Sequence, residues 1–334
     1  MKKWLLFAIK LVLTGGCLWW ALRGVDWEGS ILSRPSEILW GWLVPGVILA
    51  GLTVVLTGIR LWLLLAAQSI RISLLRAIEL TLIGNLFNLV AVGGIGGDAA
   101  RIFLLIRDHP ERKLAVTLTV MFDHLVGLVA MALVFFALTA GRFDALASQS
   151  AETKGILRFA WAFFSGGVAL MALMFVMAYP PINNRVHARS KNWKFSAIRK
   201  LPDGFDVYRQ KWRHALLALV AAAIMLPVYY ATFWCGARAA GSMVDAGPVL
   251  VAMPVVDMLS ALPLSISGLG VREISLKILM EDLTGMAPDV AVAAGLIGFF
   301  CSLVWALLGG LLFLRPRDRA KVEEIEELAV AEDG

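Results

Sequence analysis

The hydrophobic positions of this chain form long runs that polar residues rarely interrupt. A run of about 20 apolar residues is long enough for a helix to cross a lipid bilayer. Six runs reach this length and predict six membrane-spanning helices: Trp4–Leu22, Ile38–Gly58, Leu114–Ala140, Phe159–Ala178, Ala215–Gly236 and Pro288–Leu314.

Two further apolar regions, Ala77–Ile106 and Pro248–Met280, are each broken by a glycine-rich stretch. The stretches are Gly93-Gly94-Ile95-Gly96-Gly97-Asp98 and Ser265-Ile266-Ser267-Gly268-Leu269-Gly270. A helix broken at membrane depth is tolerated only where it is buried in protein or lines a wet cavity. The two breaks therefore predict a binding site.

The basic residues predict which loops face the cytoplasm, because lysine and arginine are retained there. The loop Asn183–Arg213 carries nine lysines and arginines against two aspartates, whereas Arg23–Glu37 and Gly141–Arg158 are nearly balanced and are expected outside. Further basic residues put both flanks of the first broken region, and the C-terminus, inside: Arg60, Arg71, Arg76, Arg101, Arg107, Arg112, Lys113, Arg315, Arg317 and Arg319.

These assignments of loops to the inside or outside are compatible only if each broken region enters and leaves on the same side of the membrane. We therefore expect two re-entrant hairpins and a pair of inverted repeats, residues 1–140 and 141–314, followed by a short charged cytoplasmic tail, residues 315–334. Inverted repeats with broken helices at their interface are a recurrent transporter architecture. The alternative is that the broken regions cross fully, which gives eight spans.

Composition supports an all-α polytopic membrane protein, which we expect in the plasma membrane with both termini in the cytoplasm. Hydrophobic residues make up 59% of the chain, charged residues only 17%, and the mean hydropathy is +0.77. The net charge of +6 is concentrated in short loops, which argues against nucleic-acid binding. The three cysteines lie in apolar runs, and no cofactor-binding, metal-binding or catalytic motif has a supporting context.

Both glycine breaks precede a short helical pattern that could bind a phosphate. Exposed backbone N–H groups and the helix dipole at a helix N-terminus favour an anion. The candidate headgroup-binding residues are Gly96, Gly97, Asp98, Arg101, Ser267, Gly268, Gly270, Arg272 and Glu273. The structural alternative is that Asp98 and Glu273 cap their helices while the glycines allow tight packing. It does not explain why the breaks occupy corresponding positions of two halves.

Polar residues inside apolar regions are the second group of candidates, because a carboxylate at the bilayer centre costs about 3 kcal/mol. Asp123 shares a helical face with Thr119, Gly127 and Ala130, which predicts that it faces the bundle interior. The other members of a polar route would be Asn85, Asn88 and Asp257, beside a stripe of Thr53, Thr57 and Arg60. Hydrogen bonding between helices is the structural alternative. His124 points about 100° away from Asp123 around the helix.

Three stretches resemble the lysylphosphatidylglycerol synthase transmembrane family, also called flippase-like integral membrane proteins. They run from Gly96 to Leu105, from Phe122 to Leu128 and from Pro263 to Glu273, within a likeness that extends from about Leu5 to Leu314. The family commonly has an acidic residue and an arginine where Asp123 and His124 stand, so a permanent charge is absent here. It often has a glycine where Ser267 stands.

The resemblance implies movement of a phospholipid or a polyprenyl-phosphate-linked lipid between leaflets. Some members carry a soluble aminoacyltransferase domain, which we do not expect here, so the synthase activity is not carried over. We expect a translocator with no enzymatic activity, whose partner is a membrane lipid with an anionic phosphate headgroup. The alternatives are an intramembrane lipid-modifying transferase and a non-catalytic membrane partner of a glycosyltransferase or lipid-synthesis enzyme.

Overall fold

The structure, a computed structural model, describes residues 31–90, 96–141, 150–182, 205–262 and 268–315, with isolated positions 15, 16, 19 and 184. Within these residues every regular element is a helix. The first predicted span, Trp4–Leu22, lies outside the described residues except at three positions. Residues 91–95 and 263–267, which include the first halves of the two glycine-rich stretches, also lie outside them, and Ser267 is among these.

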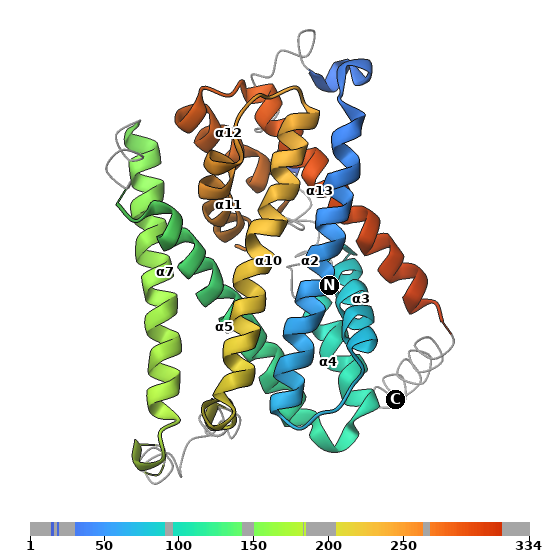
Figure 1. Cartoon of the computed structure of the whole chain (residues 1–334), viewed down its shortest axis with the longest axis vertical. Coiled ribbons are helices and arrows are strands. Elements are labelled where there is room, and N and C mark those ends of the chain that lie inside the picture. Colours follow the sequence, from blue (N-terminus) through green and yellow to red (C-terminus); the bar gives the residue numbers. More distant parts are fainter. Residues whose placement is uncertain are drawn as a thin grey trace.

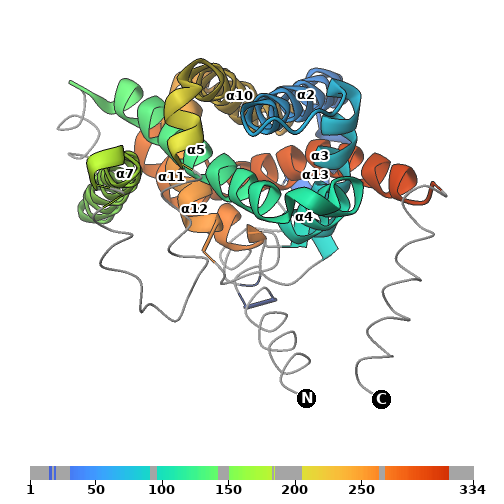
Figure 2. The ribbon, with the colours of Figure 1, turned by 90° about the horizontal axis from the view of Figure 1, so that it is seen from below.

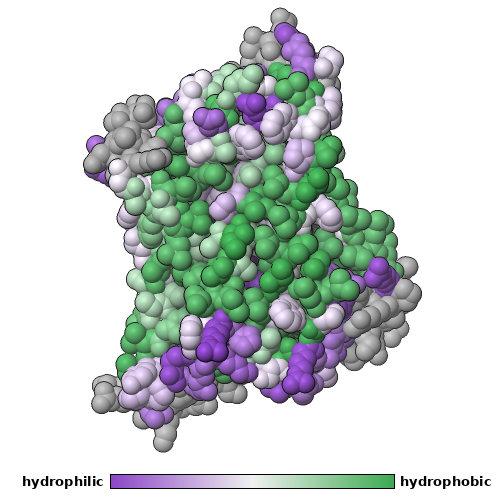
Figure 3. Space-filling view, in the orientation of Figure 1, coloured by the Kyte–Doolittle hydropathy of each residue, from purple (hydrophilic) through white to green (hydrophobic). Residues whose placement is uncertain are grey.

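Among the described residues, five helices are long and apolar enough to cross a membrane. On the face shown in Figure 3, hydrophobic residues cover the middle of the molecule, and hydrophilic residues gather at its two ends. The predicted all-α polytopic membrane fold is therefore confirmed. The long helices are α2 (Leu43–Ala67), α5 (Lys113–Thr139), α7 (Ala151–Met177), α10 (Trp212–Ala239) and α13 (Pro288–Phe313).

The predicted ends of two spans were wrong. Helix α2 continues past Gly58 to Ala67, because Arg60 is buried inside the bundle and does not mark the membrane surface. Helix α7 begins at Ala151, not at Phe159, since the Ser150 hydroxyl accepts a hydrogen bond from the Thr153 N–H at 3.0 Å and caps the helix.

The two glycine-broken regions form two pairs of short helices. Helices α3 (Leu74–Val90) and α4 (Gly96–Asp108) pack against each other, as do α11 (Ala246–Ser260) and α12 (Val271–Thr284). The first pair lies in the lower half of the molecule and the second in the upper half (Figure 1). The re-entrant course of these pairs and the inverted-repeat relation stay predictions.

Helices α2 and α10 pack against each other and lie side by side in both ribbon views, along one face of the bundle in Figure 2 (Figures 1 and 2). Helix α13 crosses close to α10, where a Cβ added at Gly236 would lie 2.5 Å from the Ala294 carbonyl oxygen. A Cβ at Gly309 would likewise collide with the Leu82 carbonyl oxygen of α3. Only glycine allows these approaches. Helix α7 lies at the edge of the bundle and packs mainly on α5 (Figure 2).

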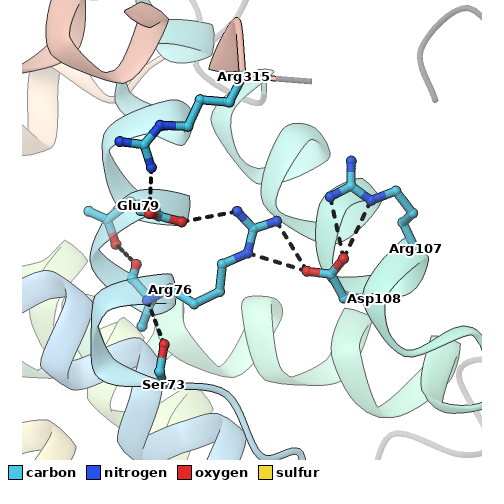
Figure 4. Close-up of polar contacts among 8 residues, drawn as sticks. Ser73, Arg76, Glu79, Arg107, Asp108 and Arg315 are labelled. Carbon is cyan, nitrogen blue, oxygen red and sulfur yellow. Dashed lines mark hydrogen bonds and ion pairs between the residues drawn. The ribbon is translucent and has the colours of Figure 1, made fainter. Parts of the chain in front are cut away.

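Basic residues of α3, α4 and the end of α13 meet in an ion-pair network (Figure 4). The guanidinium of Arg76 binds Asp108 at 3.1 Å and Glu79 at 3.3 Å, while Arg315 reaches Glu79 at 3.2 Å. Arg107 also pairs with Asp108, at 3.3 Å. The network places three arginines that were predicted to share one membrane side at the same end of the molecule.

The basic segment 183–213 was predicted to be a loop, and its last part is not one. Residues 205–210 are helical, and the ring of Tyr208 stacks on Phe122 with centroids 3.8 Å apart. The Tyr208 hydroxyl donates to the Thr119 hydroxyl at 3.1 Å and lies 3.4 Å from the Leu64 carbonyl oxygen. Burial raises the pKa of the Tyr208 phenol to about 12.

Candidate functional site

A cavity of about 750 Å³ lies among the helices of both halves of the chain. Its polar wall contains side chains from α2, α3, α4, α5, α10, α11, α12 and α13, and its apolar wall includes Leu128, Met131, Phe163, Leu262 and Leu303. The polar and charged residues of the wall are Thr53, Thr57, Arg60, Asn85, Asn88, Asp98, Asp123, His124, Tyr229, Asp257, Ser260, Arg272 and Ser302. The cavity thus offers both a charged and an apolar surface to one ligand.

Asp123 of α5 forms a two-point ion pair with Arg60 of α2. Nε of Arg60 donates to Oδ1 of Asp123 at 2.6 Å, and Nη2 donates to Oδ2 at 2.8 Å. The exposed fractions are 7% for Arg60 and 2% for Asp123, so the pair is almost fully removed from solvent. A charge is tolerated in such a place when it is paired. Gly127, one turn after Asp123, leaves room for the guanidinium, whose Nη1 lies 3.3 Å from a Cβ built there.

Asp98, in the first turn of α4, lies between two basic side chains. Its Oδ2 is 2.6 Å from Nε2 of His124, and its Oδ1 is 3.7 Å from Nη1 of Arg101. Arg101 is buried, and its Nε has no hydrogen-bond partner among the described residues. Glycine at position 84 of α3 makes space for this guanidinium, since a Cβ there would lie 2.5 Å from Nε of Arg101.

The N-terminus of α4 is held by a side chain of α3. The Gly97 N–H donates to Oδ1 of Asn88 at 2.8 Å. A Cβ at Gly97 would collide with the Gly84 carbonyl oxygen, so this glycine allows α4 to start against α3. The Gly97 amide was a candidate phosphate donor, and in this structure its hydrogen bond is made within the protein. Asn85 and Asn88 line the cavity.

At the start of α12 a glycine N–H is also bonded within the protein, here to a side chain of the same helix. Gly268 and Gly270 have φ angles of 73° and 82°, which favour glycine. The Gly270 N–H donates to Oε2 of Glu273 at 2.6 Å, and Glu273 is only 1% exposed. Glu273 therefore caps its own helix, as the structural alternative for this residue expected.

Arg272 brings positive charge to the cavity from α12. Its guanidinium carbon lies 5.6 Å from the ring centre of Phe233 and 5.5 Å from that of Phe299, a cation–π arrangement. Asp257 of α11 lines the same cavity and interacts electrostatically with Arg272. The cavity therefore has one charged cluster from α2, α4 and α5, and a second cluster from α11 and α12.

The structure brings most of the predicted site residues together. Asn85, Asn88, Asp98, Asp123, Asp257, Gly268 and Arg272 line the cavity, and Arg101 and Glu273 are buried beside lining residues. The remaining predicted residues lie at helix starts: Gly96 and Gly97 begin α4, and Gly270 is the N-cap of α12.

Sequence reasoning missed two contacts, the ion pair between Arg60 and Asp123 and the contact between His124 and Asp98. Arg60 was assigned both to the cytoplasmic flank and to a polar stripe with Thr53 and Thr57; the stripe was the signal that could have identified it as a cavity residue. The contact between His124 and Asp98 joins positions that no periodicity relates. Within the described part of the chain, no group of three or more histidine, cysteine, aspartate or glutamate residues could hold a metal ion.

Comparison with known proteins gives one family. The sequence model of the lysylphosphatidylglycerol synthase TM region matches residues 7–310. This range covers the long helices α2 to α10, both pairs of short helices and almost all of α13. No curated protein and no solved structure matches the chain significantly.

Proposed function

This chain belongs to the lysylphosphatidylglycerol synthase TM region family, and we propose that it translocates a lipid with an anionic phosphate headgroup between the leaflets of the plasma membrane. The observation that carries the proposal is the cavity of about 750 Å³, in which two charged clusters face an apolar wall. A phospholipid or a polyprenyl-phosphate-linked lipid has the matching chemistry, since its charged headgroup and its chains need different surroundings.

The arginines are the headgroup-binding groups of this proposal. Arg60 and Arg272 line the cavity, and Arg101 lies behind Asp98. Guanidinium groups bind phosphate through charge-assisted, two-point hydrogen bonds. They replace the Gly97 and Gly270 amides as the first candidates, because both amides already donate to protein oxygens. The volume is within the range of about 300–1,000 Å³ that is typical of ligand pockets.

Alternating access through two inverted repeats is the mechanism that we propose. The order of a long helix, a pair of short helices and a long helix occurs twice, as α2, α3–α4, α5 and as α10, α11–α12, α13. The two short pairs lie in opposite halves of the molecule (Figure 1). Rocking of one repeat against the other would open the cavity to each side in turn. In this arrangement both termini are cytoplasmic.

Cysteine labelling tests this topology. In a background without native cysteines, Arg71→Cys and Arg112→Cys flank the α3–α4 pair, and Met243→Cys and Gly285→Cys flank the α11–α12 pair. A membrane-impermeant maleimide applied to intact cells should label both positions of the second pair and neither of the first. Labelling of one position from each pair would mean that the pairs cross the membrane fully.

Transport is tested in liposomes of phosphatidylethanolamine and phosphatidylglycerol that contain NBD-labelled phosphatidylglycerol. The wild-type protein should move label between leaflets, and Arg272→Gln and Arg101→Gln should abolish this movement. Arg71→Gln is the matched control, because Arg71 is exposed and does not line the cavity. Wild-type rates in both cavity variants would contradict the proposed binding role. A new lipid species detected by mass spectrometry would instead indicate a lipid-modifying transferase.

A further inference from the structure

The contact between His124 and Asp98 crosses the wall of the cavity from α5 to α4. Nε2 of His124 lies 2.6 Å from Oδ2 of Asp98, and the side chains are 63% and 14% exposed, respectively. Both residues line the cavity. Asp123, the preceding residue on α5, points instead to Arg60 and is fully engaged there. His124 is thus a titratable group that remains accessible from the cavity.

Charged groups surround His124 from several elements. Helix α4 contributes Asp98 and Arg101, α5 contributes Asp123, and α2 contributes Arg60. Across the cavity α11 and α12 contribute Asp257 and Arg272, while α3 offers the neutral amides Asn85 and Asn88. Among the described charged residues of the lining, three aspartates face two arginines. This part of the wall has one net negative charge when the imidazole is neutral, and none when it is protonated.

Protonation of His124 also changes which cation balances the charge of the Asp98 carboxylate. Histidine is the side chain that ordinarily gains a proton between pH 5 and 8. When His124 is neutral, Arg101 is the cation nearest to Asp98, at 3.7 Å. When His124 is protonated, its positive charge at 2.6 Å balances Asp98, and the charge of Arg101 is left for another anion. The loss of the net negative charge and the release of Arg101 from Asp98 both favour binding of an anionic headgroup at low pH.

We propose that His124 and Asp98 form a proton-binding site that controls the entry of an anionic headgroup into the cavity. This inference rests on the proposed translocation and adds its regulation by protons. A proton bound at His124 admits the headgroup, and loss of the proton lowers the affinity of the same site. A pH difference across the membrane therefore biases the side from which lipid is taken up.

The test measures transport of NBD-labelled phosphatidylglycerol at pH values from about 5.5 to 8.5, across the range in which histidine titrates. Albumin back-extraction reports the label in the outer leaflet, and protein-free liposomes give the background at each pH. We expect the wild-type rate to rise about tenfold as the pH falls, as one added charge within about 8 Å of the headgroup allows.

Variants identify His124 as the group responsible. His124→Arg should be fast at every pH, because its charge is permanent, and His124→Gln should be slow at every pH. The matched control is His214→Gln, at the start of α10 and outside the cavity lining, which should keep the wild-type pH dependence. A pH profile that His124→Gln leaves unchanged would overturn the proton site and leave the translocator proposal intact.

A second measurement does not depend on transport. If the wild-type protein moves no lipid at any pH, the translocator proposal fails, and histidine NMR in nanodiscs decides the proton site alone. The resonance that is lost in His124→Gln should titrate between pH 5 and 8, and its midpoint should move in Asp98→Asn. A resonance that does not titrate, or a midpoint indifferent to Asp98→Asn, would refute the site.

Discussion

The ion pair between Arg60 and Asp123 should behave as one unit in the stability of the protein. Two hydrogen bonds of 2.6 and 2.8 Å join side chains that are almost completely buried, and they connect α2 to α5. Asp123→Leu leaves a guanidinium in the bundle without its carboxylate, and Arg60→Met leaves a carboxylate without its guanidinium. The double variant removes both charges and keeps apolar side chains of similar length.

The expected magnitudes follow from the burial of the pair. An unpaired charge inside a protein or at membrane depth costs about 3 kcal/mol, so each single variant should lose about that amount of unfolding free energy. Replacing a buried pair by apolar residues is often close to neutral, so the double variant should lose about 1 kcal/mol. The two changes are therefore expected to be strongly non-additive.

Unfolding in mixed micelles with increasing dodecyl sulfate, followed by circular dichroism, measures these free energies. Arg34→Met is the control, because the Arg34–Glu37 pair has side chains that are 47% and 53% exposed, and its loss should cost no more than about 0.5 kcal/mol. Additive losses in the double variant would refute the reasoning. A single variant that cannot be purified, beside a double variant that can, is the extreme form of the expected result.

Two further predictions concern packing and a buried phenol. Gly309→Ala should lose about 1–3 kcal/mol of unfolding free energy, because the new Cβ collides with the Leu82 carbonyl oxygen, whereas Gly166→Ala has open space and should be neutral in the same unfolding assay. Tyr208→Phe should lose about 1 kcal/mol at neutral pH, because the hydrogen bond to Thr119 disappears. Because folding raises the pKa of Tyr208 from 10.0 to about 12, the stabilisation by the neutral phenol is present below pH 10 and is lost as the pH rises through about 12. The stability difference between wild type and Tyr208→Phe in unfolding curves should therefore shrink and then change sign as the pH rises through this range, because a two-unit shift is worth about 2.7 kcal/mol, and a constant difference would contradict this assignment.

The long helices and the helix breaks could be predicted because both depend on local pattern. Apolar length identifies a span, and a glycine-rich stretch ends a helix whatever it packs against. The inward direction of Asp123 also followed from the small residues on its helical face, and Asp123 is 2% exposed in the structure. These features need no knowledge of the partner helix.

The pairing of charged residues could not be predicted in the same way. Arg60 and Asp123 are 63 positions apart, and their contact depends on how α2 crosses α5. Hydropathy places a membrane boundary at the first arginine, so an internally paired arginine shortens the predicted span. Tyr208 was hidden for a related reason, since the lysines and arginines around it lower the local hydropathy although its ring is buried against Phe122.

The pairing of the arginines with carboxylates has a consequence for the proposed function. Arg60 is held by Asp123, Arg101 lies beside Asp98, and Arg272 interacts with Asp257. A phosphate can bind Arg60 only by exchanging with Asp123, so part of the binding free energy is spent in separating that pair. We therefore expect a moderate affinity, which the proposed translocator would need in order to release the headgroup on the other side. The same pairing limits the charge of the empty cavity and makes its cost in the membrane tolerable.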